Sequence, residues 1–256
     1  MDISQIIGDS FEYVKKLFSD LGRLAILVIL DIIPIVSLIV LGYQTRVVKE
    51  TPTSQEPPPL RDYGDLFIQG LKVTFAVVVY MLVPMILIML GAIGFILPMI
   101  GLRATFPTAI GFVLLAVGIV LAFCIAIIMS MAIVHMVKNN SFGKAFAVGE
   151  ILQIIGKIGW GKYIVWLIVM FVISLAVGGL SMIPLIGWLL SLIVSPVLGV
   201  FAMRSAALIY SEAVPTTEAP PAPPPVGPTS TVKFCAHCGA RMPADATFCP
   251  NCGARQ

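Results

Sequence analysis

Charged side chains are scarce in this sequence. They make up 11% of its 256 residues, whereas they make up about 25% of a typical soluble domain. A soluble protein with 59% hydrophobic residues would lack the polar surface needed to cover its core. The formal net charge is only +3, so charge gives no reason to predict nucleic-acid binding. The composition excludes an ordinary soluble domain and predicts a membrane protein.

The residue patterns of common catalytic sites are lacking as well. The sequence has two histidines, and it shows no cluster of His, Asp and Glu, no serine nucleophile motif and no phosphate-binding loop. We therefore predict that the protein is not an enzyme. Cysteine is rare too: before residue 235 only Cys124 is found, inside an apolar run where a free thiol behaves as a small hydrophobe.

Long apolar runs are the main feature of the sequence. The longest apolar stretch extends from about residue 71 to residue 137, and within it residues 73–100 and 104–134 carry no charged side chain. A helix that spans a bilayer needs about 20 apolar residues. Because backbone polar groups in lipid must pair within their own segment, such runs form helices rather than isolated strands. The stretch predicts a central hairpin of two spanning helices.

A proline turn between apolar residues occurs three times, at Pro34, Pro98 and Pro184. Each turn follows an amphipathic lead-in and an apolar helix, which suggests a weak threefold repeat of a kind common in membrane folds. We predict an all-α polytopic membrane protein of three Pro-turn hairpins. Residues 3–21 and 138–162 have apolar residues at helical spacing beside charged ones, which predicts amphipathic helices in the membrane interface.

The first hairpin is open to two interpretations. Pro34 interrupts residues 24–41, so this run is either one spanning helix with a kink or a short re-entrant hairpin. Basic residues flank the run on both sides, and a single span would place one group outside, so we favour the hairpin. Asp31 is the only acid well inside an apolar run. It is either an intramembrane polar site for an ion or proton, or a helix cap at the proline turn.

The charge pattern also predicts an orientation. If all three proline turns face outward, Arg103 is the only basic residue outside, and both termini lie in the cytoplasm. We therefore expect a multi-pass protein of the cell membrane. Arg204 and His135 lie near cytoplasmic helix ends, where we expect their side chains to reach the membrane surface.

Two Cys-x-x-Cys pairs close the sequence, and they supply Cys235, Cys238, Cys249 and Cys252. Four thiolates are the ligand set of closed structural zinc sites, so we predict one structural zinc ion per chain. His237 lies between two better ligands and is not expected to bind the metal. A segment of about 25 residues cannot form a stable core alone, and the metal would supply most of its folding energy. Zinc-binding thiols require a reducing compartment, which agrees with a cytoplasmic tail.

Several short segments resemble a known family. Residues 63–72, 145–152 and 161–163 are similar to the integral-membrane domain-of-unknown-function family 4013, over about residues 1–212. The resemblance implies a multi-span membrane protein without an assigned activity, and it implies no functional residues. The tail resembles short zinc ribbons appended to many membrane proteins, which usually bind partners rather than catalyse.

We predict a transmembrane domain at residues 1–211, a Pro-rich linker at 212–231 that acts as an extended spacer, and a zinc ribbon at 232–256. The expected role is a scaffold in the lipid bilayer whose ribbon binds a cytoplasmic protein partner. The alternative is a transporter or channel for a small solute or ion, suggested by the repeat and by Asp31. The sequence leaves the oligomeric state open.

Overall fold

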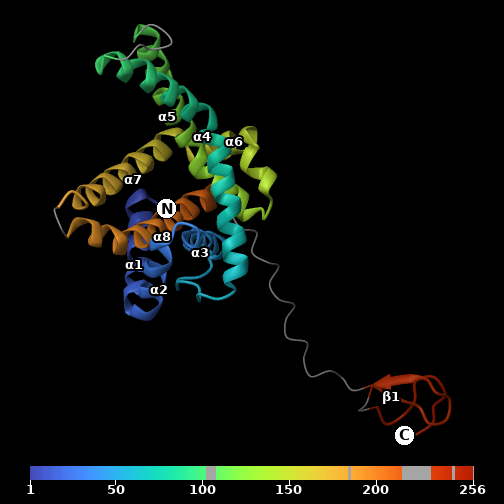
Figure 1. Ribbon diagram of the computed structural model, residues 1–256. Coiled ribbons are helices and arrows are strands. Elements are labelled where there is room, and N and C mark those ends of the chain that lie inside the picture. The colour runs from blue at the N-terminus through green and yellow to red at the C-terminus, as the bar shows by residue number, and fades with distance from the viewer. Residues whose placement is uncertain (102–107, 184–185, 215–231, 244–245, 256) are drawn as a thin grey trace. The chain divides into compact units, whose positions relative to one another are not determined.

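The computed structural model describes residues 1–101, 108–183, 186–214, 232–243 and 246–255. The chain divides into two compact units, a helical unit at Met1–Pro215 and a small unit at Thr216–Gln256 (Figure 1). The predicted all-α membrane architecture with a separate cysteine-bearing unit is confirmed. Arg103, Pro184 and the predicted linker lie almost wholly outside the described residues, so the structure does not bear on them.

The helical unit is a series of helices linked by short connections. They are α1 (Ile3–Ser19), α2 (Leu21–Ile32), α3 (Ser37–Glu50), α4 (Tyr63–Met99), α5 (Thr108–Lys138), the 3-10 helix η1 (Phe142–Phe146), α6 (Val148–Ile158), α7 (Trp160–Leu180) and α8 (Gly187–Ala213). Among the described residues, α4, α5, α7 and most of α8 are long and apolar enough to cross a membrane. The protein is therefore a multi-pass membrane protein.

The first apolar run is broken into two helices. α2 ends at Ile32 and α3 begins at Ser37, with 12 and 14 residues respectively. Each is shorter than the roughly 20 residues that a spanning helix needs. The break agrees with the hairpin interpretation, and its depth in the membrane stays a prediction. Asp31 lies inside α2, and the residue that precedes α3 is Val36, so the interpretation of Asp31 as a helix cap is wrong.

Helix α1 begins with a capping box. The Asp2 carboxylate accepts a hydrogen bond from the start of the helix, while the Gln5 side chain accepts one from the Asp2 N–H at 2.8 Å. α1 then packs against α8. Its apolar residues predict a face that includes Ile6, Phe11, Val14, Leu17 and Phe18. The buried face is rotated from it: Ser10 and Tyr13 are buried, whereas Phe11 and Phe18 are exposed. The polar side chains of α1 therefore do not all face water.

Close packing of the long hairpin depends on glycine. A Cβ atom added at Gly91 of α4 would lie 2.3 Å from the backbone nitrogen of Leu115 in α5, and one at Gly118 would lie 2.8 Å from Ile88. Helices in lipid associate through van der Waals contact rather than hydrophobic exclusion, so small residues at the contact are favourable. The glycines allow the α4 and α5 backbones to approach closely.

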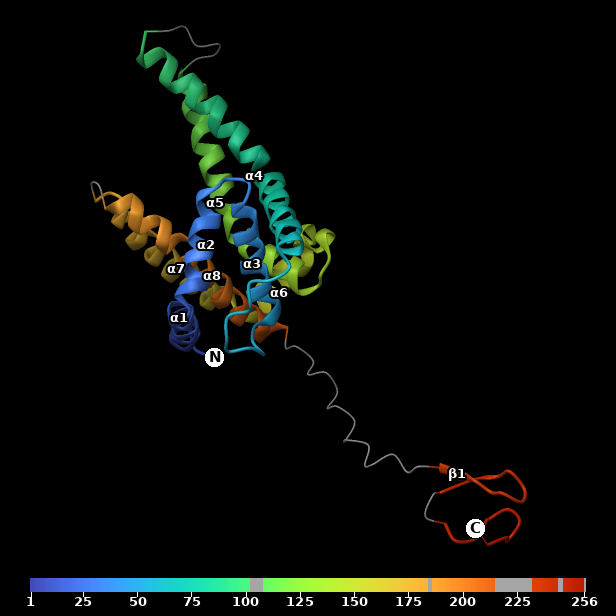
Figure 2. The ribbon, with the colours of Figure 1, turned by 60° about the horizontal axis from the view of Figure 1, so that its bottom comes forward.

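Helix α8 is the centre of the helical unit. It packs against α1, α2, α3, α5, α6 and α7. In its most apolar window 56% of the residues are buried, compared with 6% in α5 and 17% in α4. The central hairpin predicted from residues 71–137 therefore exposes most of its apolar length, and the packed core lies around α8. Figure 2 shows the C-terminal ends of α4 and α7 on the side away from the N-terminus.

The second amphipathic segment is η1 followed by α6. The buried face of α6 consists of Ile151, Ile154, Ile155 and Ile158, whereas the apolar side chain of Leu152 is exposed. The Tyr80 hydroxyl of α4 donates to the carbonyl of Ala145 at 2.6 Å and fixes η1 on that helix. The threefold repeat is only partly visible, because the lead-in of the second unit is continuous with α4 rather than a separate helix.

Candidate metal centre and polar clusters

The small unit brings the four predicted cysteine ligands together. Their sulfur atoms all lie within 4.8 Å of one another. The sulfurs of Cys235 and Cys252 are 3.6 Å apart, and those of Cys238 and Cys249 are also 3.6 Å apart. A tetrahedral site with zinc–sulfur bonds of about 2.3 Å has sulfur–sulfur edges of about 3.8 Å. The cluster fits a four-coordinate metal, and His237 is not part of it.

The unit is built from two copies of one eight-residue motif. Residues 234–241 read FCAHCGAR and residues 248–255 read FCPNCGAR. In each copy the first cysteine donates its backbone N–H to the alanine carbonyl five residues later, at 2.9 Å. The strands β1 (Val232–Phe234) and β2 (Arg241–Pro243) pair antiparallel around the first copy.

A glycine closes each turn. Gly239 and Gly253 have φ angles of +70° and +72°, which residues with a side chain rarely adopt. Each glycine donates its N–H back to the first cysteine of its own motif. Backbone N–H groups of Cys238 and His237 lower the pKa of the Cys235 thiol to about 6. The thiolate is the metal-binding form of cysteine, so this turn prepares Cys235 for a metal.

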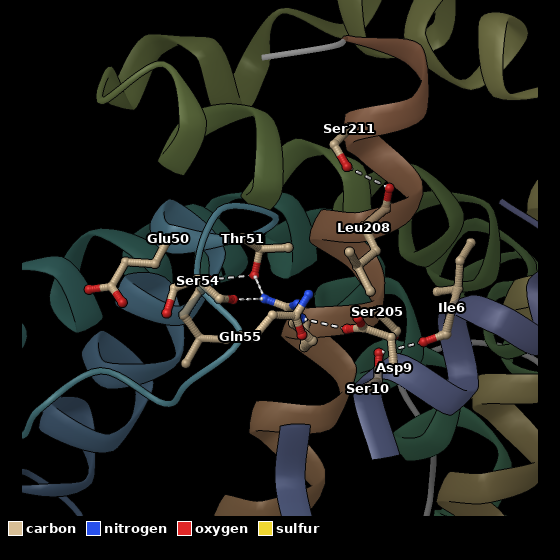
Figure 3. A network of polar contacts seen from close by, with 12 residues as sticks. Ile6, Asp9, Ser10, Glu50, Thr51, Ser54, Gln55, Ser205, Leu208 and Ser211 are labelled. Atoms are coloured by element: carbon tan, nitrogen blue, oxygen red, sulfur yellow. Dashed lines mark hydrogen bonds and ion pairs between the residues drawn. The ribbon is translucent and has the colours of Figure 1, made fainter. Parts of the chain in front are cut away.

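Arg204 forms a second cluster, inside the helical unit, and its partners Asp9, Thr51 and Ser54 are labelled in Figure 3. Its side chain is fully buried, and its Nε donates to the Asp9 carboxylate at 2.9 Å. Its Nη1 donates to the Thr51 hydroxyl at 3.2 Å and to the Ser54 carbonyl at 2.7 Å. The guanidinium lies 4.5 Å from the centre of the Tyr13 ring. The prediction that Arg204 reaches the membrane surface is therefore wrong.

Cationic side chains hold the connector between α3 and α4. This connector contains four prolines among residues 50–60. Because proline has no N–H, the connector has few backbone donors for its own carbonyl groups, although Ser54 donates to the Glu56 carbonyl. Side chains from α1, α2, α3, α5 and α8 donate to other carbonyls of the connector. The donors other than Arg204 are Lys16 to Gln55, Arg23 to Pro57, Arg46 to Pro59, and Lys138 to Thr51. The connector is thus fixed on the helices.

His135 forms a third cluster that joins α5, α6 and α8. It is 6% exposed, so the prediction that it reaches the membrane surface is also wrong. Its Nδ1 lies 2.8 Å from the Tyr210 hydroxyl and its Nε2 lies 2.9 Å from Glu150. Glu150 also accepts from Lys144 at 2.7 Å. Hydrogen bonds from Lys144, and then from His135, hold the pKa of Glu150 below its usual value.

Asp31 has a simpler environment. Its partly exposed carboxylate accepts a hydrogen bond from the Ser195 hydroxyl, which links α2 to α8. Across the residues that the structure describes, the four cysteines are the only group of His, Cys, Asp or Glu residues placed to hold a metal ion. The structure therefore does not bring Asp31 together with other predicted site residues.

The Arg204 and His135 clusters were missed by sequence reasoning. Ionisable residues within membrane helices usually face the bundle interior and pair there, and that signal was present at both positions. Their partners could not be identified, because Asp9 precedes Arg204 by 195 residues along the chain.

A multi-pass helical unit followed by a two-turn unit with four convergent thiols defines a membrane protein that carries a zinc-ribbon domain. Residues 234–256 match the zinc-ribbon domain family. The chain belongs to the family described as protein of unknown function DUF4013, which matches residues 25–204. No curated protein and no solved structure matches the chain at a significant level. The resemblance stated from the sequence is confirmed.

Proposed function

We propose that the protein is a membrane-embedded recruitment protein whose ribbon binds one zinc ion and docks a protein partner at the membrane. The observation that carries this proposal is the convergence of four cysteine sulfurs on a compact unit separate from the membrane helices. Four thiolates leave a zinc ion no open coordination position, so the metal has a structural role. The proposal accordingly assigns the chain no catalytic activity and no nucleic-acid partner.

In this proposal the ribbon and the N-terminus lie in the cytoplasm, and the helices cross the cell membrane. Thiol ligands stay reduced in that compartment. The basic side chains that hold the connector, among them Arg23, Arg46 and Lys138, come from three helices and meet at this one segment. An excess of Lys and Arg marks the cytoplasmic side of membrane proteins.

Metal analysis tests the first step. The purified full-length protein should contain about one zinc ion per chain. The double variant Cys235→Ser and Cys238→Ser should lose it, because two thiolates cannot hold zinc tightly. His237→Ser is the matched control: it changes an exposed residue of the same turn and should retain the metal. A wild-type chain without zinc, or zinc loss in the control alone, would contradict the assignment.

Co-purification tests the second step. The wild-type chain, the two-cysteine variant and the His237→Ser control are purified in mild detergent, and their bound proteins are quantified by mass spectrometry. We expect at least one protein that is enriched with the wild type and the control but absent from the two-cysteine variant. Identical partner sets for all three chains would count against recruitment by the ribbon.

The alternative function is transport of a small ion or solute. The observation that favours it is the Asp31 carboxylate, which meets the Ser195 hydroxyl between two apolar helices. Proton or cation flux into vesicles containing the protein should then be lost in Asp31→Asn. Glu12→Gln, on the exposed face of α1, is the matched control and should keep the flux. Vesicles that show no more flux than empty ones would exclude this role for the tested ions.

A further inference from the structure

The small unit exposes two large aromatic side chains. Phe234 is 66% exposed and Phe248 is 60% exposed. In the antiparallel register Phe234 lies opposite Arg241, and an isolated bridge places Phe248 opposite Arg255. Residues directly opposite one another in an antiparallel pair project from the same face. The unit thus carries two Phe/Arg pairs, one in each copy of the eight-residue motif.

The metal does not explain these pairs. Metal binding requires the cysteines, and the turn requires the glycine, but neither requires phenylalanine or arginine beside them. Outside the metal centre, where a zinc ion and four thiolates together carry a charge of about −2, the side-chain charges point in the same direction. Residues 232–256 contain three basic residues, Lys233, Arg241 and Arg255, and one acid, Asp245. Exposed aromatic rings beside cationic side chains are complementary to a surface that has anionic groups on its outside and an apolar layer directly below them.

We infer that the Phe/Arg pairs bind the surface of an anionic bilayer, with the phenylalanine rings in the interface and the arginines on the lipid phosphates. Segments that lie on membranes combine apolar or aromatic residues with Lys and Arg in this way, and cations are attracted to anionic lipid headgroups. Two phenylalanines present much less area than the roughly 800 Å² per partner of a standard protein interface. The pairs therefore suit a lipid surface better than a protein one.

The covalent attachment makes such weak binding effective. Only 17 residues separate Val214 from Val232, and at full extension they reach roughly 60 Å. The small unit can never diffuse away from a bilayer that holds the helices. Binding to the bilayer is then intramolecular in effect, and a weak affinity is enough to populate the bound state. This inference goes beyond the proposed recruitment of a protein partner and does not depend on it.

The test uses the full-length chain in lipid nanodiscs. A dye is attached at the C-terminus, an acceptor dye is attached to lipid headgroups, and the dye pair is chosen for short-range energy transfer. Discs of phosphatidylcholine alone are compared with discs that also contain phosphatidylglycerol. We expect higher transfer in the anionic discs at low salt than at high salt, because salt screens the arginine–phosphate attraction.

Variants then separate the two parts of each pair. The double variant Phe234→Ser and Phe248→Ser should lose most of the transfer increase. The variant Arg241→Gln and Arg255→Gln should lose its dependence on phosphatidylglycerol. His237→Ser should behave as the wild type, and equal zinc content in all chains verifies that the ribbon remains folded. Transfer that is the same in both lipids, or that is unaffected by the phenylalanine changes, would overturn the inference.

A protein partner is the other outcome. If the phenylalanine variant keeps the lipid signal of the wild type but loses a co-purifying protein, the pairs serve the partner and not the bilayer. In that case the lipid inference fails while the proposed recruitment stands. If instead the lipid signal is lost and the partner set is unchanged, the lipid inference holds by itself.

Discussion

Arg204 is a charged residue in a helix that is apolar enough to span a membrane, and its side chain is fully buried. A buried charge is costly unless it is paired and hydrogen-bonded. Asp9 supplies the opposite charge, while Thr51 and Ser54 accept further hydrogen bonds. These partners come from α1 and from the connector after α3, so one side chain ties three distant parts of the chain together.

Replacing Arg204 should therefore destabilise the helical unit. Arg204→Met leaves the Asp9 carboxylate without its ion pair and the Ser54 carbonyl without a donor. Breaking a buried pair in this way costs about 3 kcal/mol, which should appear as a lower thermal unfolding temperature in detergent. Arg61→Met is the control, because that residue is exposed and surface changes cost less than about 0.5 kcal/mol.

The double variant Arg204→Met and Asp9→Asn sharpens this test. It removes both charges, so it should be less destabilised than the sum of the two single changes. An unfolding temperature of Arg204→Met equal to that of Arg61→Met would show that the ion pair contributes nothing.

At the scale of elements, the contact between α4 and α5 is governed by glycine. Gly91→Ala places a Cβ about 2.3 Å from the Leu115 nitrogen, so the two helices must separate. Overpacking costs about 1–3 kcal/mol, and a clash this close with backbone belongs to the upper part of that range, which exceeds the roughly 1 kcal/mol that alanine adds to helix propensity. Unfolding in detergent should show the variant to be less stable than the wild type.

Gly178→Ala in α7 is the matched control, since nothing lies within 4 Å of a Cβ at that position. It should leave stability unchanged or raise it slightly through helix propensity. Equal stabilities of the two alanine variants would contradict the close helix contact.

The cluster that joins α6 to α5 predicts a pH dependence. The pKa of Glu150 is lower in the folded protein than its ordinary value of 4.5, through hydrogen bonds from Lys144 and His135. A carboxyl group with a depressed folded pKa adds stability that is present above its unfolded pKa and is lost as the pH falls through its folded pKa. The wild type should thus be more stable than Glu150→Gln at pH 6. This difference in stability should decrease as the pH falls below 4.5 and should be lost below the folded pKa of Glu150.

Unfolding temperatures measured across this pH range provide the comparison. The groups that face Glu150 and His135, namely Lys144, Tyr210 and Asn139, are common to both proteins. A stability difference that does not change with pH would mean that the charge of Glu150 has no part in holding α6.

At the scale of the whole molecule, the core around α8 and the apolar hairpins differ in their surroundings. The core is packed among helices, whereas the hairpins expose apolar side chains. Buried side chains gather where α8 meets α1, α3, α5 and α6, whereas most of α5 and α7 has exposed apolar side chains that suit contact with lipid. The orientation proposed here places the turn near Met99 outside and the exposed face of α6 inside.

Cysteine labelling in intact cells tests that orientation. In a Cys124→Ser background, Met99→Cys should react with a membrane-impermeant maleimide, because Met99 is 73% exposed at the end of α4. Gln153→Cys, on the exposed side of α6, should react only after lysis. The reverse pattern would invert the topology and place the ribbon outside the reducing compartment.

Sequence reasoning was accurate where the signal is local. Runs such as residues 73–100 predict helices through length and composition, and the paired Cys-x-x-Cys segments predict a four-thiol cluster through spacing. It was wrong for Asp31 as a cap, for the exposure of Arg204 and His135, and for the buried face of α1. Each of these depends on which distant element lies against the residue.

The sequence alone therefore determined the membrane class, the positions of the long helices and the identity of the four thiols, because apolar length and ligand spacing act over a few helical turns. Only the tertiary structure decided that α8 is the central helix, that cations hold the connector and that Arg204 meets Asp9. The contacts of Arg204 with Asp9 and Ser54 join residues 195 and 150 positions apart, and their geometry follows from how the helices pack.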